Sequence, residues 1–510
     1  MKGLLVLFLI CSFGQVLAWT GGGRAPSEQQ KTILMVDDQQ VLYRSGTERV
    51  LRPLDRHPEN PMLPSDKPWE LTVAYCSVHR DPTTGYYQLW YQAWGKLCYA
   101  TSEDGLHWVK PNLGLHDYEG ESDTNILLDI GFGGGVLFDP RDPDPSRRYK
   151  FAYWGSGKLG DFEHLGLLVA FSPDGIHWTK HPRAPVLKGS HGEYILPPFA
   201  DDPGIATGKL GGPPLSTSDV TDPIWDPGHD TFAIYSKTWL DGPDGTMHWK
   251  RAVVRTDSKD FVHWSTPRLV VAPDELDGWG GDERELARTA GGGGSDGKQL
   301  HSGPAFYYNG MYFSLLQVLD SGATGNMPIE LALSHDGYQW QRPFRNSPFL
   351  PALEDKTQFD ASIIWSNATP VLLEDEFRFY YGAYSNQWNI DDDRKQISGV
   401  GLATMPRDRF AGIRPLGRIG QITMKPLDLR AVSSVTLNAD ASQGSIRVEL
   451  LNEAGYRVKG WSKVEANVIQ GDHLSHPVGW RNRGIGDLPA GRYKLRIHLD
   501  NAKIYAMTLD

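Results

Sequence analysis

One short turn occurs four times in the chain, and it constrains the fold more than any other feature. The copies span residues 101–108, 171–178, 256–264 and 333–340, and each places an Asp four positions before a Trp. The four Trp residues are 70, 86 and 76 positions apart, and residues 402–410 form a degenerate fifth copy. Self-similarity at a regular spacing is typical of repeat folds.

A short aromatic strand is expected upstream of each copy, and the five are residues 86–91, 149–154, 231–235, 311–315 and 377–381. Turn residues precede each, and a further apolar stretch precedes the turn, as at 71–78 and 361–365. Asp-Gly between strands favours a hairpin. Five four-stranded units at this spacing predict an all-β chain, a five-bladed β-propeller.

The pattern predicts three segments along the chain. Residues 1–18 have the charged, apolar and small-residue regions of a signal peptide. Residues 19–420 hold the propeller, and residues 33–36 could supply an outer strand to blade five and close the ring. After Gly420, short β-rich stretches at 433–438, 445–451, 492–498 and 503–509 predict a small β-sandwich over 421–510.

Composition narrows the partners and the location. With 56 Gly and 17 Trp in 510 residues, a helical bundle is disfavoured. The formal charge of −11 lacks the basic footprint of a nucleic-acid-binding protein. No apolar run of membrane-spanning length follows the signal, so we expect a secreted or periplasmic protein. We also expect a monomer that acts on carbohydrate.

Cys76 and Cys98 are the cysteines that remain after signal cleavage. They lie in separate predicted strands with another strand between them, which favours buried thiols. A disulfide is the alternative in an exported protein.

The repeated Asp turns are expected to be structural, so the chemistry should lie where the innermost strands begin, at the opposite face. Polar residues at those starts include an acid in four blades: Glu70, Asp129, Asp219 with Asp222, and Asp360. Blade four offers His301, either a sugar or ion ligand or a structural residue. Glycoside cleavage needs two carboxyl groups in different protonation states.

Aromatic residues end the second strands on the same predicted face, at Trp94, Trp154, Trp239 and Tyr384. Each either stacks on a sugar ring or caps a blade core. Glu283 is a loop-borne acid or part of a solvated charge cluster. Residues 391–393 are three Asp that favour a solvated loop over a calcium site, and we expect no metal or cofactor.

Over residues 30–420 the chain resembles the five-bladed glycosidases of the invertase, levansucrase and arabinanase type, in families 32, 43 and 68. The blade count, the repeated turns and the segment His57-Pro58-Glu59-Asn60-Pro61-Met62-Leu63 carry the resemblance. It implies acids from blades one, two and three, hence Glu70, Asp129 and either Asp219 or Asp222; the reading of strand starts adds Asp360. We rank Asp219 and Asp360 highest.

The chain departs from that family in its motifs. The invertase sequence Trp-x-Asn-Asp-Pro-Asn-Gly and the Glu-Cys acid motif are absent. Arg141-Asp142-Pro143 matches the family's Arg-Asp-Pro triplet but falls in a predicted turn, so the triplet's role is not carried over. We therefore predict a secreted glycoside hydrolase and keep two alternatives. One is a mannoside-type phosphorylase using Arg251, Arg255 or Arg284, and the other is a non-catalytic sugar-binding propeller.

Overall fold

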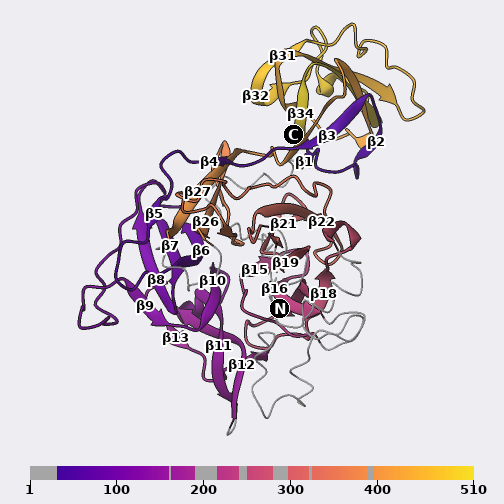
Figure 1. Cartoon of the computed structure of the whole chain (residues 1–510). Coiled ribbons are helices and arrows are strands. Elements are labelled where there is room, and N and C mark those ends of the chain that lie inside the picture. Colours follow the sequence, from indigo (N-terminus) through magenta and orange to yellow (C-terminus); the bar gives the residue numbers. More distant parts are fainter. Residues whose placement is uncertain are drawn as a thin grey trace, which may run out of the picture.

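The computed structural model describes residues 31–159, 162–189, 215–240, 250–278, 297–320, 324–386 and 396–510. Within these ranges the protein is all-β, with five sheets arranged as the blades of a propeller and a further ten-stranded sheet (Figure 1). The only helical turns in the described ranges are 3-10 turns at Pro145–Arg147, Glu275–Asp277 and Ile485–Asp487. No helix there is long and apolar enough to cross a bilayer. The predicted signal peptide lies outside the described residues.

The five blades follow one another along the chain, and the strands within each blade pair antiparallel. Blade 1 contains β6 (Val73–Arg80), β7 (Tyr87–Ala93), β8 (Lys96–Ser102) and β9 (Ile126–Asp129). Blade 2 contains β10 (Phe132–Phe138), β11 (Tyr149–Leu159), β12 (Phe162–Ser172), β13 (Thr179–Lys180) and β14 (Leu187–Lys188). Blade 3 contains β15 (Pro223–Asp226), β16 (Thr231–Leu240), β17 (Lys250–Ser258) and β18 (Arg268–Val271).

Blades 4 and 5 carry extra short strands beside the same plan. Blade 4 contains β19 (Lys298–Ser302), β20 (Ala305–Tyr308), β21 (Met311–Asp320), β22 (Ile329–Ser334) and β23 (Trp340–Gln341). Blade 5 contains β24 (Ile363–Trp365), β25 (Val371–Leu372), β26 (Glu376–Tyr384) and β27 (Ser398–Pro406). Its outer strands are β4 (Asp55–Arg56) and β5 (Leu63–Pro64), which pair with β27 and close the ring.

The expectation that residues 33–36 close the ring is wrong. β1 (Lys31–Leu34) pairs instead with β34 (Lys503–Leu509) in the C-terminal sheet. Ile33 packs into the apolar core of that sheet, which offers the strand a hydrogen-bonding edge and cover for its side chains.

The ten-stranded sheet, called the C-terminal unit below, combines strands from both ends of the chain. Besides β1 and β34 it contains β2 (Val41–Ser45), β3 (Thr47–Leu51), β28 (Ala411–Pro415), β29 (Ile419–Met424), β30 (Leu427–Asp428), β31 (Val435–Asn452), β32 (Ile469–Pro477) and β33 (Arg492–Asp500). In Figure 1 the indigo strands β1–β3 lie among the yellow C-terminal ones. The two-layer sandwich expected here stays a prediction.

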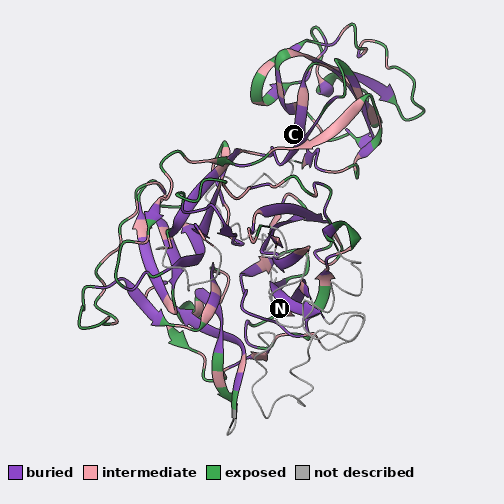
Figure 2. Cartoon of the chain, viewed as in Figure 1, coloured by how far each residue is buried: buried purple, intermediate pink, exposed green. Residues whose placement is uncertain are grey.

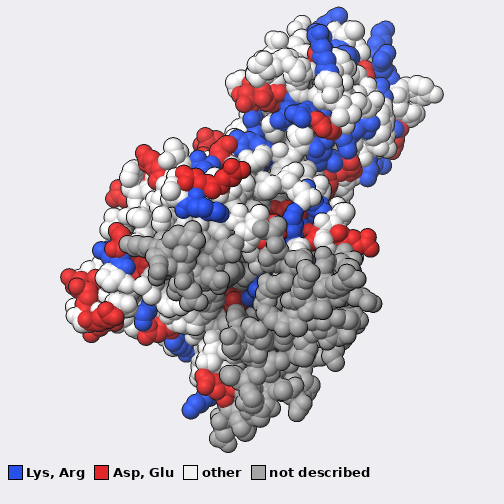
Figure 3. All heavy atoms as spheres, viewed as in Figure 1, with Lys and Arg blue, Asp and Glu red and all other residues white. Residues whose placement is uncertain are grey.

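Charge is divided unevenly between these parts. Residues 411–510 hold 14 Lys and Arg against 9 Asp and Glu, whereas the whole chain has a net charge of −11. Basic side chains accordingly stand out on the C-terminal unit (Figure 3). The propeller is the acidic part of the molecule.

Three of the four repeated turns form hydrogen bonds with the neighbouring blade. The carbonyls of Gly105, Gly175 and Gly337 accept hydrogen bonds from Tyr380 Oη (2.8 Å), Trp90 Nε1 (2.6 Å) and Tyr235 Oη (2.9 Å), respectively. These glycines have φ between 71° and 80°, the left-handed conformation that glycine adopts without strain. The turns therefore join neighbouring blades, the structural role expected of them.

Most blade strands are buried along their length (Figure 2). Cys76 in β6 and Cys98 in β8 are both free and buried, with β7 between their strands. This agrees with the favoured expectation of buried thiols.

Candidate active site

The central side chains of the propeller come from four of its blades and form one cluster, called the central cluster below. Its members are Tyr75 (β6), Asp219 and Asp222 (before β15), Lys237 and Trp239 (β16), Arg251 (β17), His301 (β19), Trp365 (β24) and Tyr384 (β26). All but Arg251 are at most 5 % exposed. The aromatic members Tyr75, Trp365 and Tyr384 pack with Val220, Ala74 and Ile363 in one apolar group.

Asp219 and Lys237 form an ion pair in which each side chain is only 3 % exposed. Ser218 Oγ donates a further hydrogen bond of 3.2 Å to Asp219 Oδ1. Burial lowers the pKa of Lys237, with Arg251 adding to the effect and Asp219 opposing it. A buried ion pair is costly to separate, because either charge left alone has no solvent around it. The pair therefore fixes the position of the Asp219 side chain.

Asp222, three residues further on, has different surroundings. Burial raises the pKa of its carboxyl well above the usual value, because burial disfavours the charged form. Its Oδ2 has no hydrogen-bond partner among the described residues. A Cβ at Gly135 would lie 2.9 Å from Asp222 Oδ1, so the glycine of blade 2 makes room for this carboxyl. A buried polar atom without a partner is expensive and calls for an explanation.

Tyr75 links the two acids electrostatically. Burial raises the pKa of its phenol, and the charges of Asp219 and Asp222 both raise it further. Its hydroxyl also lacks a hydrogen-bond partner in the described part of the chain. Its ring packs on Trp365, with centroids 4.5 Å apart. The phenol therefore stays neutral, with a proton available near both carboxyl groups.

His301 is a neutral imidazole. Burial lowers its pKa well below the usual value, and Lys237 adds to the effect. Its Nδ1 lies 3.2 Å from Gln317 Oε1, and the Gln317 amide nitrogen donates to Ser366 Oγ at 3.2 Å. Because the amide nitrogen is used in this way, Oε1 is the acceptor and Nδ1 carries the proton. Nε2 is then the basic nitrogen.

A cation and an aromatic ring form another side of the cluster. The Arg251 guanidinium carbon lies 4.4 Å from the centroid of Trp239. Arg251 Nη1 donates to Gln299 Oε1 at 2.9 Å, and Gln299 comes from β19 of the next blade. Stacking on an aromatic face suits a guanidinium, so Arg251 is oriented across the boundary between blades 3 and 4.

Of the sequence candidates, the structure brings Asp219, Asp222, Trp239, His301 and Tyr384 together. Tyr384 packs against Trp365 with centroids 5.9 Å apart. Glu283 and residues 391–393 lie outside the described residues.

The structure places the other three acids elsewhere. Glu70 is held inside blade 1, where Tyr91 Oη (2.5 Å), Lys110 Nζ (2.7 Å) and two backbone N–H groups donate to it. Asp129 ends the outer strand of blade 1; its side chain is 64 % exposed and pairs with Lys96 at 2.5 Å. Asp360 accepts from Arg56 Nε (2.6 Å) of the outer strand β4 and from Tyr381 Oη (2.8 Å).

Two of the predicted aromatic contacts also lie apart from the cluster. Trp94 occupies the turn between β7 and β8, is 47 % exposed and has a φ of 36°. Trp154 is buried in blade 2 against Gly189, where any added side chain would collide with its ring.

Lys237 and Tyr75 are central residues that the sequence did not single out. A lysine inside a run of ten buried strand residues, 231–240, is the signal that would have found Lys237. Tyr75 lay in a predicted inner strand but resembled an ordinary core aromatic. Among the described residues, no three His, Cys, Asp or Glu side chains gather closely enough to hold a metal ion.

No family model matches the chain, and neither does any curated protein. The chain is similar in structure to BT0996 in its complex with RGII, with 13 % identity, coverage of 70 % of this protein and 92 % of that one, and a TM-score of 0.44. It is similar to an N-acetylgalactosamine deacetylase from F. plautii bound to blood group B trisaccharide (16 % identity, 69 % and 96 % coverage, TM-score 0.42). A structure described with the GH130 mannoside phosphorylases and hydrolases gives 14 % identity, 71 % and 95 % coverage, and a TM-score of 0.38.

Proposed function

We propose that the protein is a glycoside hydrolase whose central cluster cleaves a glycosidic bond, with Asp222 as the acid and Asp219 as its ionised partner. One observation carries the proposal: two buried carboxyl groups three residues apart have different surroundings, since Asp219 is paired with Lys237 whereas burial raises the pKa of Asp222 well above its usual value. Glycosidases need this division, because one group protonates the leaving oxygen while the other acts at the anomeric carbon.

In the proposed reaction Asp222 gives its proton to the glycosidic oxygen as the bond to the anomeric carbon breaks. Asp219 either attacks that carbon or takes a proton from the attacking water, and in both routes water supplies the new hydroxyl. Lys237 keeps Asp219 ionised and in place. The anomeric configuration of the first product, read by NMR, distinguishes the two routes.

The remaining members of the cluster suit a sugar substrate. Trp239 and Trp365 are buried apolar rings packed on Arg251 and Tyr75, and Tyr75, His301 and Arg251 carry hydrogen-bonding groups beside them. A site of this kind combines apolar walls with a few fixed polar groups, as small-molecule sites generally do.

The test is a screen of the purified mature protein against a panel of oligo- and polysaccharides, followed by Asp219→Asn and Asp222→Asn. Each variant should lower kcat/KM about 10²- to 10⁴-fold, the usual contribution of acid–base catalysis. Asp129→Asn is the matched control, because Asp129 is an exposed acid on an outer strand. Full activity in both central variants would overturn the assignment.

A phosphorylase is the second candidate, because the cluster holds two cations, Lys237 and Arg251, beside the carboxyl groups. Inorganic phosphate would then replace water as the attacking group, and the product would be a glycosyl phosphate. Turnover measured with and without phosphate separates the two functions. Binding of a glycan without any turnover would point instead to a sugar-binding propeller.

We also propose that the chain is exported after cleavage behind Ala18 and acts as a monomer. N-terminal sequencing of the protein recovered from the culture medium or periplasm tests the first point. Light scattering of the mature protein tests the second.

A further inference from the structure

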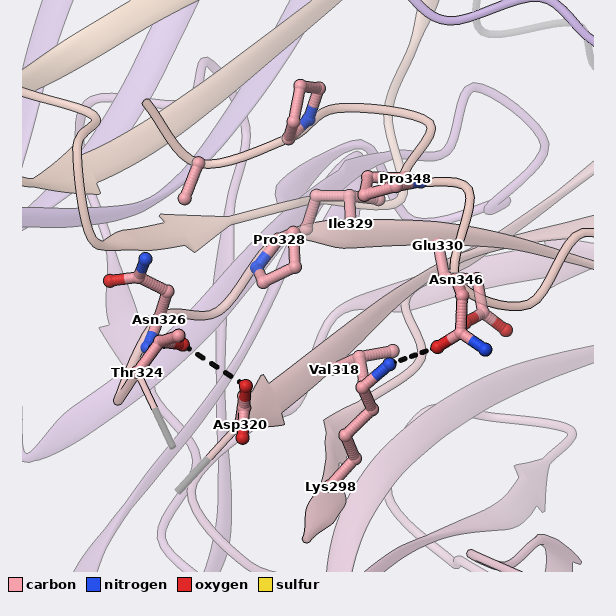
Figure 4. A pocket seen from close by; sticks show the side chains of 12 residues that line it. Lys298, Val318, Asp320, Thr324, Asn326, Pro328, Ile329, Glu330, Asn346 and Pro348 are labelled. Carbon is pink, nitrogen blue, oxygen red and sulfur yellow. Dashed lines mark hydrogen bonds between the residues drawn. The ribbon is translucent and has the colours of Figure 1, made fainter. Parts of the chain in front are cut away.

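A cavity lies beside blade 4, and no part of the proposed chemistry uses it. It has a volume of about 240 Å³ and is bounded by β19, β21, the start of β22 and the segment 346–352 (Figure 4). We call it the blade 4 pocket. Its wall includes Pro328, Pro348 and Pro351, and its polar side chains are Lys298, Asp320, Thr324, Asn326, Glu330 and Asn346.

The wall of this pocket is held in place from behind. Arg342 lies buried between two acids, with Nε 2.6 Å from Glu330 and Nη1 2.5 Å from Asp277. The backbone of Ile329 accepts from Phe349 N–H at 2.7 Å and donates to the Leu350 carbonyl at 2.9 Å. Three prolines with fixed φ add to this rigidity. The pocket is therefore pre-formed, which reduces the ordering cost of binding.

The polar groups are balanced in charge and varied in kind. Lys298 bonds to Asn346 Oδ1 across the pocket, and Thr324 Oγ1 lies 3.2 Å from Asp320 Oδ2 (Figure 4). Asn326 Oδ1 accepts from Lys356 Nζ at 3.1 Å. Glu330 is paired with Arg342, so the remaining polar groups are one cation, one anion, two amides and a hydroxyl. This set favours a neutral ligand with many hydroxyl groups. The proline faces suit the C–H face of such a ligand.

The position of the pocket relates it to the central cluster. Strand β19 begins with Lys298 at the pocket; Gln299 bonds to Arg251, and His301 lies in the cluster. At about 3.4 Å per residue, the strand covers the interval from Lys298 to His301 in about 10 Å. A chain of a few sugar units could therefore reach both places.

We propose that the blade 4 pocket is a distal subsite for a neutral sugar unit of the oligosaccharide that the central cluster acts on. The proposal rests on the proposed function for its substrate class. It predicts that the pocket contributes to binding of long saccharides and not to the chemistry at the cluster.

The test uses Ala352→Tyr, which fills the pocket, and Thr324→Val, which removes one hydroxyl and keeps the shape. Ser347→Tyr is the matched control, because Ser347 is exposed on the same segment and does not line the pocket. The probes are neutral tetrasaccharides of glucose, mannose, galactose, xylose, fructose and arabinose, with tetragalacturonate as the anionic comparison. Calorimetry measures binding to the full mature chain, independently of any turnover.

For the tetrasaccharide that binds best, Ala352→Tyr should weaken Kd about tenfold and Thr324→Val by less, while Ser347→Tyr leaves Kd unchanged. An aryl monosaccharide should lose no affinity in any variant. Unchanged tetrasaccharide binding in Ala352→Tyr, binding of none of the neutral probes, or preference for tetragalacturonate would overturn the subsite. Binding that depends on Ala352 in a protein that hydrolyses nothing would refute the hydrolase and leave the subsite standing.

Discussion

The repeated turns and the central cluster both contain aspartates, but the surroundings of these aspartates are opposite in kind. In the repeated turns, Asp174 Oδ1 accepts the backbone N–H groups of Ile176 and His177 at 2.9 and 2.8 Å, and Oδ2 lies 2.7 Å from His177 Nδ1. At the axis, Asp222 is buried with one oxygen lacking a partner among the described residues. A satisfied carboxylate stabilises a fold, whereas an unsatisfied one costs stability. The contrast separates the residues that build the ring from those we assign to chemistry.

The central ion pair offers the largest test of this contrast. Lys237→Met leaves Asp219 buried without its cation, so it should destabilise the protein by about 3–5 kcal/mol and abolish activity. The measurement is urea unfolding, provided that the transition is cooperative.

The double variant Asp219→Asn with Lys237→Met is the informative partner. Removing both charges should recover most of the stability and none of the activity, because a buried ion pair is often no better than neutral residues of similar size. If Lys237→Met alone keeps full stability, the pair is not the constraint described here.

Asp222→Asn should separate stability from function. Activity should fall about 10³-fold, since the amide has no acidic proton to give. Folding stability at neutral pH should hold or rise, because the buried acid that burial penalises is gone. Parallel kinetics and thermal unfolding check this, and a large loss of stability would show that Asp222 is structural instead.

The sequence predicted the repeated turns better than it predicted the central cluster. The turn motif repeats four times, and repetition reveals blade count and local hairpins, because the same contacts are made in every blade. Asp219, Asp222 and His301 were found from their place at strand starts. Lys237 was not found, because a buried lysine needs a partner that is close in space, and no sequence motif marks that partner.

Asp360 shows why the remaining acids could not be sorted in advance. It precedes a buried inner strand just as Asp219 and Asp222 do, but its side chain turns to Arg56 of the strand that closes the ring. That strand was expected at residues 33–36, which the C-terminal unit takes up through β34. Ring closure pairs Arg56 with Ala403 and Leu63 with Val400, residues more than 300 positions apart, and no local pattern encodes it.

Within the turns, Asp174→Ala should cost about 1 kcal/mol of stability and leave kcat/KM unchanged. The modest size follows from exposure, because the Asp174 side chain is 44 % exposed and solvent screens its contacts. Ser172→Ala removes the hydroxyl that accepts from the Gly175 N–H at 2.9 Å and should act in the same direction. If either variant kept its stability and lost activity, the repeated turns would take part in the chemistry, and the assignment of the central cluster would be wrong.

The smallest expected effect is a difference in the sign of pH dependence. Burial alone would raise the pKa of Asp174, but hydrogen bonds from His177 outweigh it and lower the pKa to about 2. Its contribution is therefore present above the unfolded value of about 3.9 and is lost as the pH falls toward about 2. Asp222 has a raised pKa, so its contribution is present below about 3.9 and is lost as the pH rises. Relative to the native chain, Asp174→Asn should lose stability at pH 7 and lose less stability at pH 2.5. Asp222→Asn should gain stability at pH 7 and show no gain at pH 2.5. Unfolding measured at both pH values, with Asp129→Asn as the exposed control, would refute the contrast if the two variants shifted in the same direction.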